Sequence, residues 1–186
     1  VQALLRDDEA LVAILVGSSR SFVWALTRER AEWAEIDAGS AILAEHVAVL
    51  RNGLDPLAQQ DAEGSAGSKA GVVQGFDLTR AHALYKLVLG PVAPVLAGKQ
   101  HLLVVPTGPL TSIPFQVLIT APPGPQAGVE ALRDAAWLIK SHALSVLPSV
   151  QSLNALRKLA PRATAAKPFF GIGDPVLDGP SAPRQR

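Results

Sequence analysis

The sequence contains no cysteine, so few of its side chains could act as a nucleophile. Ser112 is a formal candidate, because it lies in the turn of HLLVVPTGPLTSIPFQVLI, residues 101–119. An apolar run that stops at Pro106 and resumes after such a turn is typical of an active-site rim. A serine nucleophile would need a histidine base beside it, and a GxSxG motif is absent. We therefore predict no catalytic residue.

The histidines and carboxylates do not form a metal site by their spacing. No histidine has a second histidine or a carboxylate at metal-ligand spacing. The four histidines are His46, His82, His101 and His142. The adjacent Asp7, Asp8 and Glu9 would point apart in a helix or strand, so we expect a solvated turn there. We predict no metal site.

One glycine motif begins like a dinucleotide-binding fingerprint. In GIGDPV, residues 171–176, Gly171 and Gly173 follow an apolar run, as a phosphate cradle requires. Val176 stands where the third glycine belongs, and the following DGPSAP does not open a helix. GxxxxGK[ST] is absent. We expect a turn at the end of a strand and no cofactor.

The charge balance argues against nucleic-acid and membrane partners. Lys plus Arg is 17 and Asp plus Glu is 16, and no basic run is dense. We interpret two pairs of nearby basic residues as surface charge: Arg157 with Lys158, and Arg184 with Arg186. No apolar run approaches the ~18 residues of a membrane span. The acidic RDDEA close to Val1 does not resemble a signal peptide, and we expect a cytoplasmic protein.

The N-terminal part predicts a hairpin followed by a helix. Residues 9–29 hold two apolar runs around the turn GSSR, which is typical of a β-hairpin, and residues 31–37 could add a third strand. Residues 40–55 predict a helix that Ser40 caps. Four apolar residues share one face of this helix: Leu43, Val47, Leu50 and Leu54.

The middle of the sequence predicts two helices and a buried strand. Residues 77–100 are helical, with Asp77 as N-cap and with an interruption at Gly90 and Pro91. Pro91 can open a second short helix. Three residues share a face of the first helix: Ala81, Tyr85 and Val88. Residues 101–105 form an unbroken apolar run after His101, as in a strand covered on both faces.

The C-terminal part predicts strand, helix and strand. Residues 136–149, which include His142, read as a strand, and Ser149 can cap a helix over 150–159. Its apolar positions are Val150, Leu153, Leu156 and Leu159. Residues 167–175 predict a last strand that ends in a turn. Core packing is expected for the three tryptophans, Trp24, Trp33 and Trp137.

Short buried strands joined by helices predict an α/β sandwich, with helices packed on a mainly parallel sheet. The small, polar and glycine-rich residues 57–75 predict a flexible loop inside one domain that covers residues 1–186. Residues 178–186 predict a tail. Because the sequence has no methionine and closes in turn-forming residues, we interpret it as a piece of a longer protein.

Residues 101–119 resemble the signature of the CHAT domain, a caspase-like cysteine-peptidase family usually found beside tetratricopeptide repeats. That signature is an apolar strand, then Pro, a small or acidic residue, Gly, a Leu, and a Pro-Phe pair before an apolar run. The matching residues here are 102–105, Pro106, Thr107, Gly108, Leu110, Pro114 and Phe115.

Four other segments are similar to the family in the same order. VGSSRSFVWALTRE resembles its opening hairpin, and DLTRAHALYKLVLGPV its Leu-Tyr helix followed by Pro. WLIKSHALSVLPSVQSLNAL resembles its strand, Pro-Ser and helix, and FFGIGDPVL its next strand, ending in Gly-Asp-Pro. The resemblance implies a three-layer caspase-like sandwich, of which this chain is the N-terminal portion.

The catalytic pair of that family is a histidine in a His-Gly turn and a cysteine, both downstream of the Gly-Asp-Pro strand. This sequence holds neither a His-Gly nor a cysteine. The resemblance thus implies the non-catalytic scaffold of a cysteine endopeptidase domain, since a thiolate and its imidazole must come from elsewhere. A protein-interaction or signalling module with a peptidase-like fold is the alternative, and an unrelated α/β binding domain is a third.

The resemblance also implies protein partners. These are the tetratricopeptide-repeat region of the parent protein and a protein substrate. In addition, the strand near residues 169–172 would be left at a bare sheet edge, through which we expect self-association.

Overall fold

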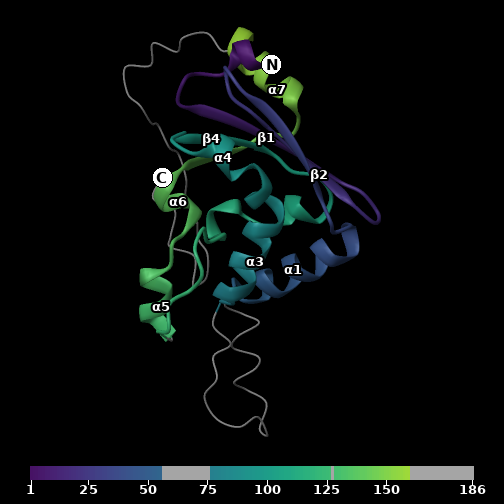
Figure 1. Cartoon of the computed structure of the whole chain (residues 1–186). Coiled ribbons are helices and arrows are strands. Elements are labelled where there is room, and N and C mark those ends of the chain that lie inside the picture. The colour runs from purple at the N-terminus through teal and green to yellow at the C-terminus, as the bar shows by residue number, and fades with distance from the viewer. Residues whose placement is uncertain (56–75, 127, 160–186) are drawn as a thin grey trace, which may run out of the picture.

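A computed structural model gives the fold of the chain (Figure 1). The residues that it describes are 1–55, 76–126 and 128–159. Three predictions lie outside the described residues: the loop 57–75, the strand 167–175 and the tail 178–186. Within the described residues, no helix has the length and apolar character needed to cross a membrane.

A five-stranded mixed sheet organises the domain, in the order β3-β2-β1-β4-β5. The strands are β1 (Glu9–Val16), β2 (Ser21–Leu26), β3 (Ala31–Ile36), β4 (His101–Val105) and β5 (Ala143–Val146). The pairs β1–β2 and β2–β3 are antiparallel, whereas β1–β4 and β4–β5 are parallel. The α/β class, the hairpin with its third strand and the strand 101–105 are confirmed. The prediction of a mainly parallel sheet is corrected: two pairs are parallel and two antiparallel, because the hairpin and its third strand join the sheet as an antiparallel unit.

Helices pack on one face of this sheet (Figure 1). They are α1 (Ser40–Asn52), α3 (Leu78–Val88), η2 (Gly90–Val92) and α4 (Ala93–Leu96). The predicted inward residues Leu43, Val47 and Leu50 are buried in the hydrophobic core on this side of the sheet. Burial of these apolar side chains supplies the larger of the two hydrophobic cores.

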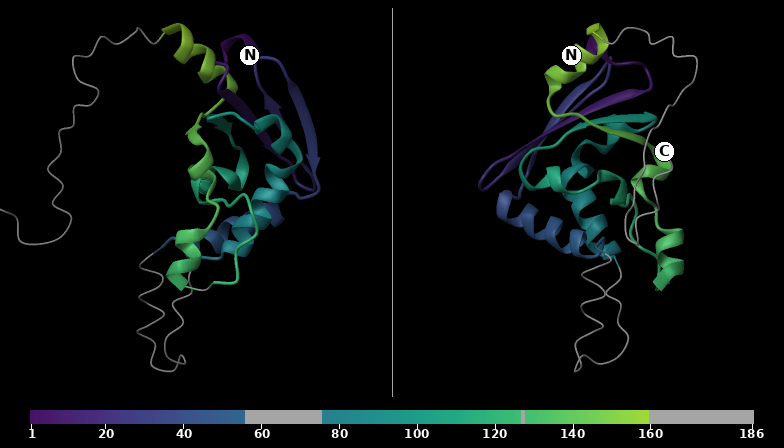
Figure 2. Two further views of the ribbon diagram at one scale, coloured as in Figure 1. Left: turned by 60° about the vertical axis from the view of Figure 1, so that its left-hand side comes forward. Right: turned by 180° about the vertical axis from the view of Figure 1, so that it is seen from behind.

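The opposite face is covered only in part (Figure 2). There α7 (Val150–Leu159) and η1 (Gln2–Leu4) close a smaller cluster. Its buried residues are Leu5, Leu11, Leu103, Val105, Leu147 and Leu153. Helices thus lie on both faces, which gives the three layers of the sandwich. The hairpin end of this second face has no covering helix among the described residues.

The core position predicted for Trp33 is therefore wrong. Its side chain lies on the uncovered hairpin face and is 64% exposed. The rings of Trp33 and Trp24 each lie near that of Phe22, with centroids 6.4 and 6.1 Å away. Trp24 is half-buried on the same face. Trp137 is half-buried against the larger core, as predicted, with its ring 5.6 Å from that of Phe76.

Two of the three predicted helix caps are confirmed. The Asp77 carboxylate accepts a hydrogen bond from the Arg80 N–H at 2.8 Å, and Ser149 Oγ accepts one from the Ser152 N–H at 3.2 Å. Ser40 is not the cap, because it is the first residue of α1 and Gly39 occupies the N-cap position. A Cβ on Gly39 would lie 2.0 Å from the Ser18 carbonyl oxygen, so this close approach sets the start of the helix.

The long strand predicted over residues 136–149 is shorter than expected. Residues Leu138–Ser141 form the short helix α6, and β5 begins only at Ala143. The N–H of Leu138 donates to the Leu118 carbonyl at 2.8 Å, and the Leu138 side chain is buried in the larger core. His142 therefore lies between α6 and β5, not within the strand.

The helix α5 (Gly128–Asp134) was not predicted: it is short and has no fully buried residue, and only Ala131 and Leu132 pack in part against the larger core. The prediction that Leu54 completes the buried face of α1 is wrong, because the helix ends at Asn52 and Leu54 is exposed.

Candidate functional site

The rim that follows β4 is the candidate site, because the carboxyl end of a parallel strand is where α/β sheets bind ligands. It consists of Pro106, Thr107, η3 (Gly108–Ser112) and η4 (Phe115–Val117). The Thr107 hydroxyl accepts a hydrogen bond from the Val16 N–H at 2.8 Å and donates one to the Ile14 carbonyl at 3.0 Å. The rim is thereby fixed to the end of β1.

Gly108 is required at the first position of η3 for two reasons. Its φ of +56° is in the region that side chains rarely adopt. A Cβ at this position would also lie only 3.3 Å from Cβ of Val16. The glycine of the CHAT-like signature thus permits a tight turn directly against the end of β1.

The apolar residues of the rim face inward. Leu110, Ile113, Phe115, Leu118 and Ile119 are all buried in the larger core. Phe115 is among the largest side chains that are fully buried. The rim therefore works as a plug between the sheet and α1, and the signature residues Leu110 and Phe115 contribute packing, not chemistry.

Ser112 lies at the exposed end of this plug. Its carbonyl accepts a hydrogen bond from Arg51 Nη1 at 3.4 Å. Three histidines have partners in other places. His82 Nδ1 lies 3.1 Å from the Ile119 carbonyl oxygen, His101 Nδ1 lies 3.0 Å from Asp8 Oδ2, and His142 Nδ1 lies 2.7 Å from Ser141 Oγ. The structure thus brings none of these three imidazoles to the Ser112 hydroxyl.

His46 is the fourth histidine and lies on α1. Its Nδ1 is buried and has no hydrogen-bond partner among the described residues. Burial lowers the pKa of His46 below its ordinary value of 6.5, and the nearby positive charge of Arg80 lowers it further. Glu45 and Asp77 act in the opposite direction but are weaker. His46 is therefore neutral at pH 7.

The three adjacent carboxylates point apart, as predicted, but one of them is not solvated. At the surface, Asp7 forms an ion pair with Arg28 at 3.2 Å, and Asp8 Oδ2 lies 3.0 Å from Nδ1 of His101. Glu9 is buried at 5% exposure and pairs with Arg157 at 2.6 Å. The predictions of a solvated turn at Glu9 and of plain surface charge at Arg157 are therefore wrong.

This pair is a feature that reasoning from the sequence missed. A single acidic residue opening the run EALVAILV carries no sign of a partner almost 150 residues away.

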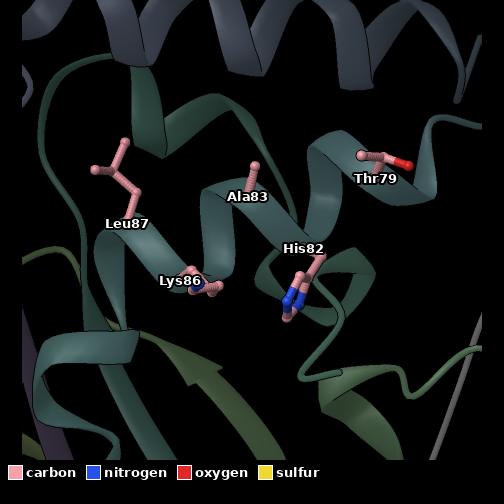
Figure 3. Close-up of a pocket in the computed structure, with 5 residues that line it drawn as sticks. All are labelled: Thr79, His82, Ala83, Lys86 and Leu87. Atoms are coloured by element: carbon pink, nitrogen blue, oxygen red, sulfur yellow. The ribbon is translucent and has the colours of Figure 1, made fainter. Parts of the chain in front are cut away.

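An open groove runs along the outer side of α3 (Figure 3). It is lined by Thr79, His82, Ala83, Lys86 and Leu87. Beside it, His82 stacks on Tyr85 with ring centroids 6.4 Å apart, and burial raises the pKa of Tyr85. The lining contains no carboxylate, and its one hydroxyl is that of Thr79. The groove therefore offers no carboxylate for acid–base or nucleophilic chemistry.

A metal site is not formed by the described residues either. Nowhere in 1–55, 76–126 and 128–159 do three or more His, Asp or Glu side chains gather closely enough to hold an ion. The prediction that the chain carries no catalytic, cofactor or metal residue stays a prediction for the sequence as a whole.

The fold and the rim define a class: a three-layer α/β domain with a short glycine turn after a buried parallel strand. A comparison with family models places the chain within that class. The model of the CHAT domain matches residues 78–185, which is more than half of the sequence. The chain belongs to the CHAT domain family, and its fold is accordingly of the caspase-like peptidase type. A search of curated proteins finds no match.

Proposed function

We propose that the chain is the N-terminal scaffold of a CHAT-type cysteine endopeptidase domain and does not cleave peptides alone. One observation carries this proposal: the family match over residues 78–185 coexists with the absence of any cysteine in the sequence. A caspase-like mechanism needs a thiolate activated by an imidazole. Both groups would come from a further part of the parent protein.

The packing supports one scaffold that includes residues before the family match. β1 precedes residue 78, yet it pairs in parallel with β4 over five positions, from Glu9–His101 to Ala13–Val105. The rim after β4 is fixed to β1 through Thr107. The scaffold would hold the carboxyl ends of its parallel strands rigid beside the catalytic portion.

A peptidase assay of the chain tests the first part of the proposal. We expect no turnover of a panel of fluorogenic peptides. Turnover that survives metal chelators and disappears in Ser112→Ala would contradict the proposal and indicate a serine hydrolase. Thr111→Ala is the matched control, because Thr111 is the neighbouring exposed hydroxyl and donates only to the Gly108 carbonyl, at 2.8 Å.

The parent gene tests the second part. We expect a His-Gly turn and then a cysteine, each after an apolar strand, within about one typical domain length of ~100–150 residues after Arg186. A reading frame of that length that encodes neither residue would favour the alternative function.

The alternative is a non-catalytic interaction or signalling module, and the uncovered hairpin face favours it. Trp33 and Leu15 are 64% and 52% exposed there, beside Phe22 and Trp24. Exposed aromatic groups of this kind are typical of protein interfaces. The proposed partner is the tetratricopeptide-repeat region of the parent protein.

Binding of that repeat region, measured by calorimetry, tests the alternative. The alternative function predicts weaker binding by the Trp33→Ala variant. It predicts unchanged binding by Ile42→Ala, because Ile42 is exposed on α1, on the other side of the sheet. Equal affinities in the two variants would contradict a role for the hairpin face.

A further inference from the structure

The N-terminal segment (residues 1–6) and α7 meet at one buried carboxylate, that of Glu9. Both carboxylate oxygens lie 2.6 Å from Nη2 of Arg157, near the end of α7. Oε2 also accepts a hydrogen bond from the Arg6 backbone N–H at 2.8 Å. The first residue of β1 therefore binds both the segment that enters the sheet and a helix from the far end of the described chain.

Arg157 makes a second contact with the N-terminal segment. Its Nε donates to the Leu4 carbonyl, in η1, at 3.3 Å. The guanidinium thus divides its donors between β1 and η1, in a forked geometry that arginine can supply. Both views in Figure 2 show the N-terminus beside α7.

The same two elements also share the smaller apolar cluster. Leu5 from the N-terminal segment and Leu153 from α7 are buried in it against the sheet. Departure of α7 would remove the close Arg157 guanidinium from Glu9, leaving only that of Arg6, whose Nε lies 3.9 Å from Oε1, and would uncover Leu5. Departure of the N-terminal segment would remove the Leu4 carbonyl from Arg157 and uncover Leu153. Each element is therefore stabilised by the other, since a buried charge without its partner is costly.

The rest of the domain does not depend on this contact. The larger core lies on the other face of the sheet and shares no buried residue with the smaller cluster. The helices α1 and α3 belong to that larger core. Release of the N-terminal segment and α7 would accordingly be a local unfolding event that leaves most of the sheet and its helices in place.

We propose that Glu9 and Arg157 form a latch through which the N-terminal segment and α7 dock on the sheet, and leave it, together. In the sequence, α7 directly precedes residues 160–185, the last part of the family match. The effect of a ligand or a force that acts on residues 1–6 would therefore be transmitted to α7. The inference does not depend on whether the parent protein is a peptidase.

Hydrogen exchange measured by mass spectrometry on the chain tests the latch. Deletion of residues 1–6 should speed exchange of the α7 amides by about tenfold or more, while α1 and α3 stay unchanged. Arg157→Gln should likewise speed exchange of the Leu4 and Leu5 amides, although these residues are remote in sequence. Arg133→Gln is the control: it breaks the exposed Glu130–Arg133 pair of α5 and should affect neither element.

Three results would overturn the latch. In the first, the α7 amides stay protected from exchange after residues 1–6 are deleted. In the second, the Leu4 and Leu5 amides stay protected in Arg157→Gln. Either result means that the two elements are independent. In the third, exchange rises equally in α1, α3 and α7, which makes Glu9 an ordinary residue of a single cooperative core. Arg157→Lys, which retains the charge, is measured in the same way if the glutamine variant does not fold.

Discussion

At the scale of single residues, His46 gives the domain a defined response to pH. Its pKa is lowered in the folded state, so the unfolded chain binds the proton more tightly. Stability should therefore be highest above the unfolded pKa of 6.5 and should fall as the pH drops through 6.5 toward the folded pKa.

We expect His46→Gln to reduce this loss. The loss of stability is the free energy of unfolding at pH 7.5 minus that at pH 5.5, each measured by urea unfolding. Ile42→Gln, on the exposed side of the same helix, should keep the difference between the two pH values that the unmutated chain shows. An unchanged difference in His46→Gln would show that the imidazole does not titrate with folding.

Helix caps allow a second test, because the same sequence pattern was right at Asp77 and wrong at Ser40. The Asp77 carboxylate accepts a hydrogen bond from the Arg80 N–H, whereas the side chain of Ser40 makes no cap bond. Asp77→Ala should cost about 1 kcal/mol of stability, and Ser40→Ala almost nothing. Chemical denaturation measures both. Equal losses in the two variants would mean that the structural assignment of the caps is wrong.

These two helices also show what a sequence can predict about a helix start. A polar residue before an apolar run is a local signal, and it is sufficient when nothing else constrains the chain. At α1 the N-cap is Gly39 and not the predicted Ser40, and Gly39 lies directly against the backbone of Ser18 in the hairpin turn. Contacts of this kind leave no local trace in the sequence.

At the scale of elements, the unbroken apolar run of β4 predicted a strand covered on both faces. The structure agrees: Leu102 and Val104 face the larger core, and Leu103 and Val105 face the smaller one. The hairpin and α3 were equally predictable, because their patterns are strong and local. The helix α6 was not, since its apolar residues were compatible with a strand and a tertiary contact at Leu118 decided the outcome.

Val104 and its register partner Val146 provide a matched pair for β4. Val104 is fully buried, whereas Val146 is 54% exposed on β5. Val104→Asp would bury an unpaired carboxylate and should cost several kcal/mol, a large part of the ~5–15 kcal/mol that stabilises a typical domain. Val146→Asp should change the melting temperature little. Similar melting temperatures for the two variants would contradict the central position of β4.

At the scale of the whole molecule, the sequence predicted the class of the fold but not its assembly. The α/β class and the family followed from patterns along the chain. Three features depend instead on which segments meet in space: the pairing of β1 with β4, the contact between Glu9 and Arg157 on the second face, and the exposure of Trp33. The candidate site was predicted as a rim without chemistry; its apolar residues are buried in the larger core, whereas Thr111 and Ser112 are exposed.

The edges of the sheet are the last feature at this scale. The described sheet ends at β3 on one side and at β5 on the other. β3 carries Glu32 and Glu35, which form ion pairs with Arg30 and Arg20 and make its edge a poor partner for another strand. β5, with the sequence ALSV, has no charged residue, and within the described residues it pairs only with β4.

We therefore expect the self-association predicted from the sequence to occur at β5. The predicted strand near residues 169–172 lies outside the described residues. An uncharged edge exposes unpaired N–H and C=O groups, on which a second copy can add a strand. Light scattering over a concentration series should show a dimer that Val146→Lys disrupts. Ala31→Lys, on the already charged edge β3, should leave it intact. If the unmutated chain stays monomeric at the highest concentration, the β5 edge is covered.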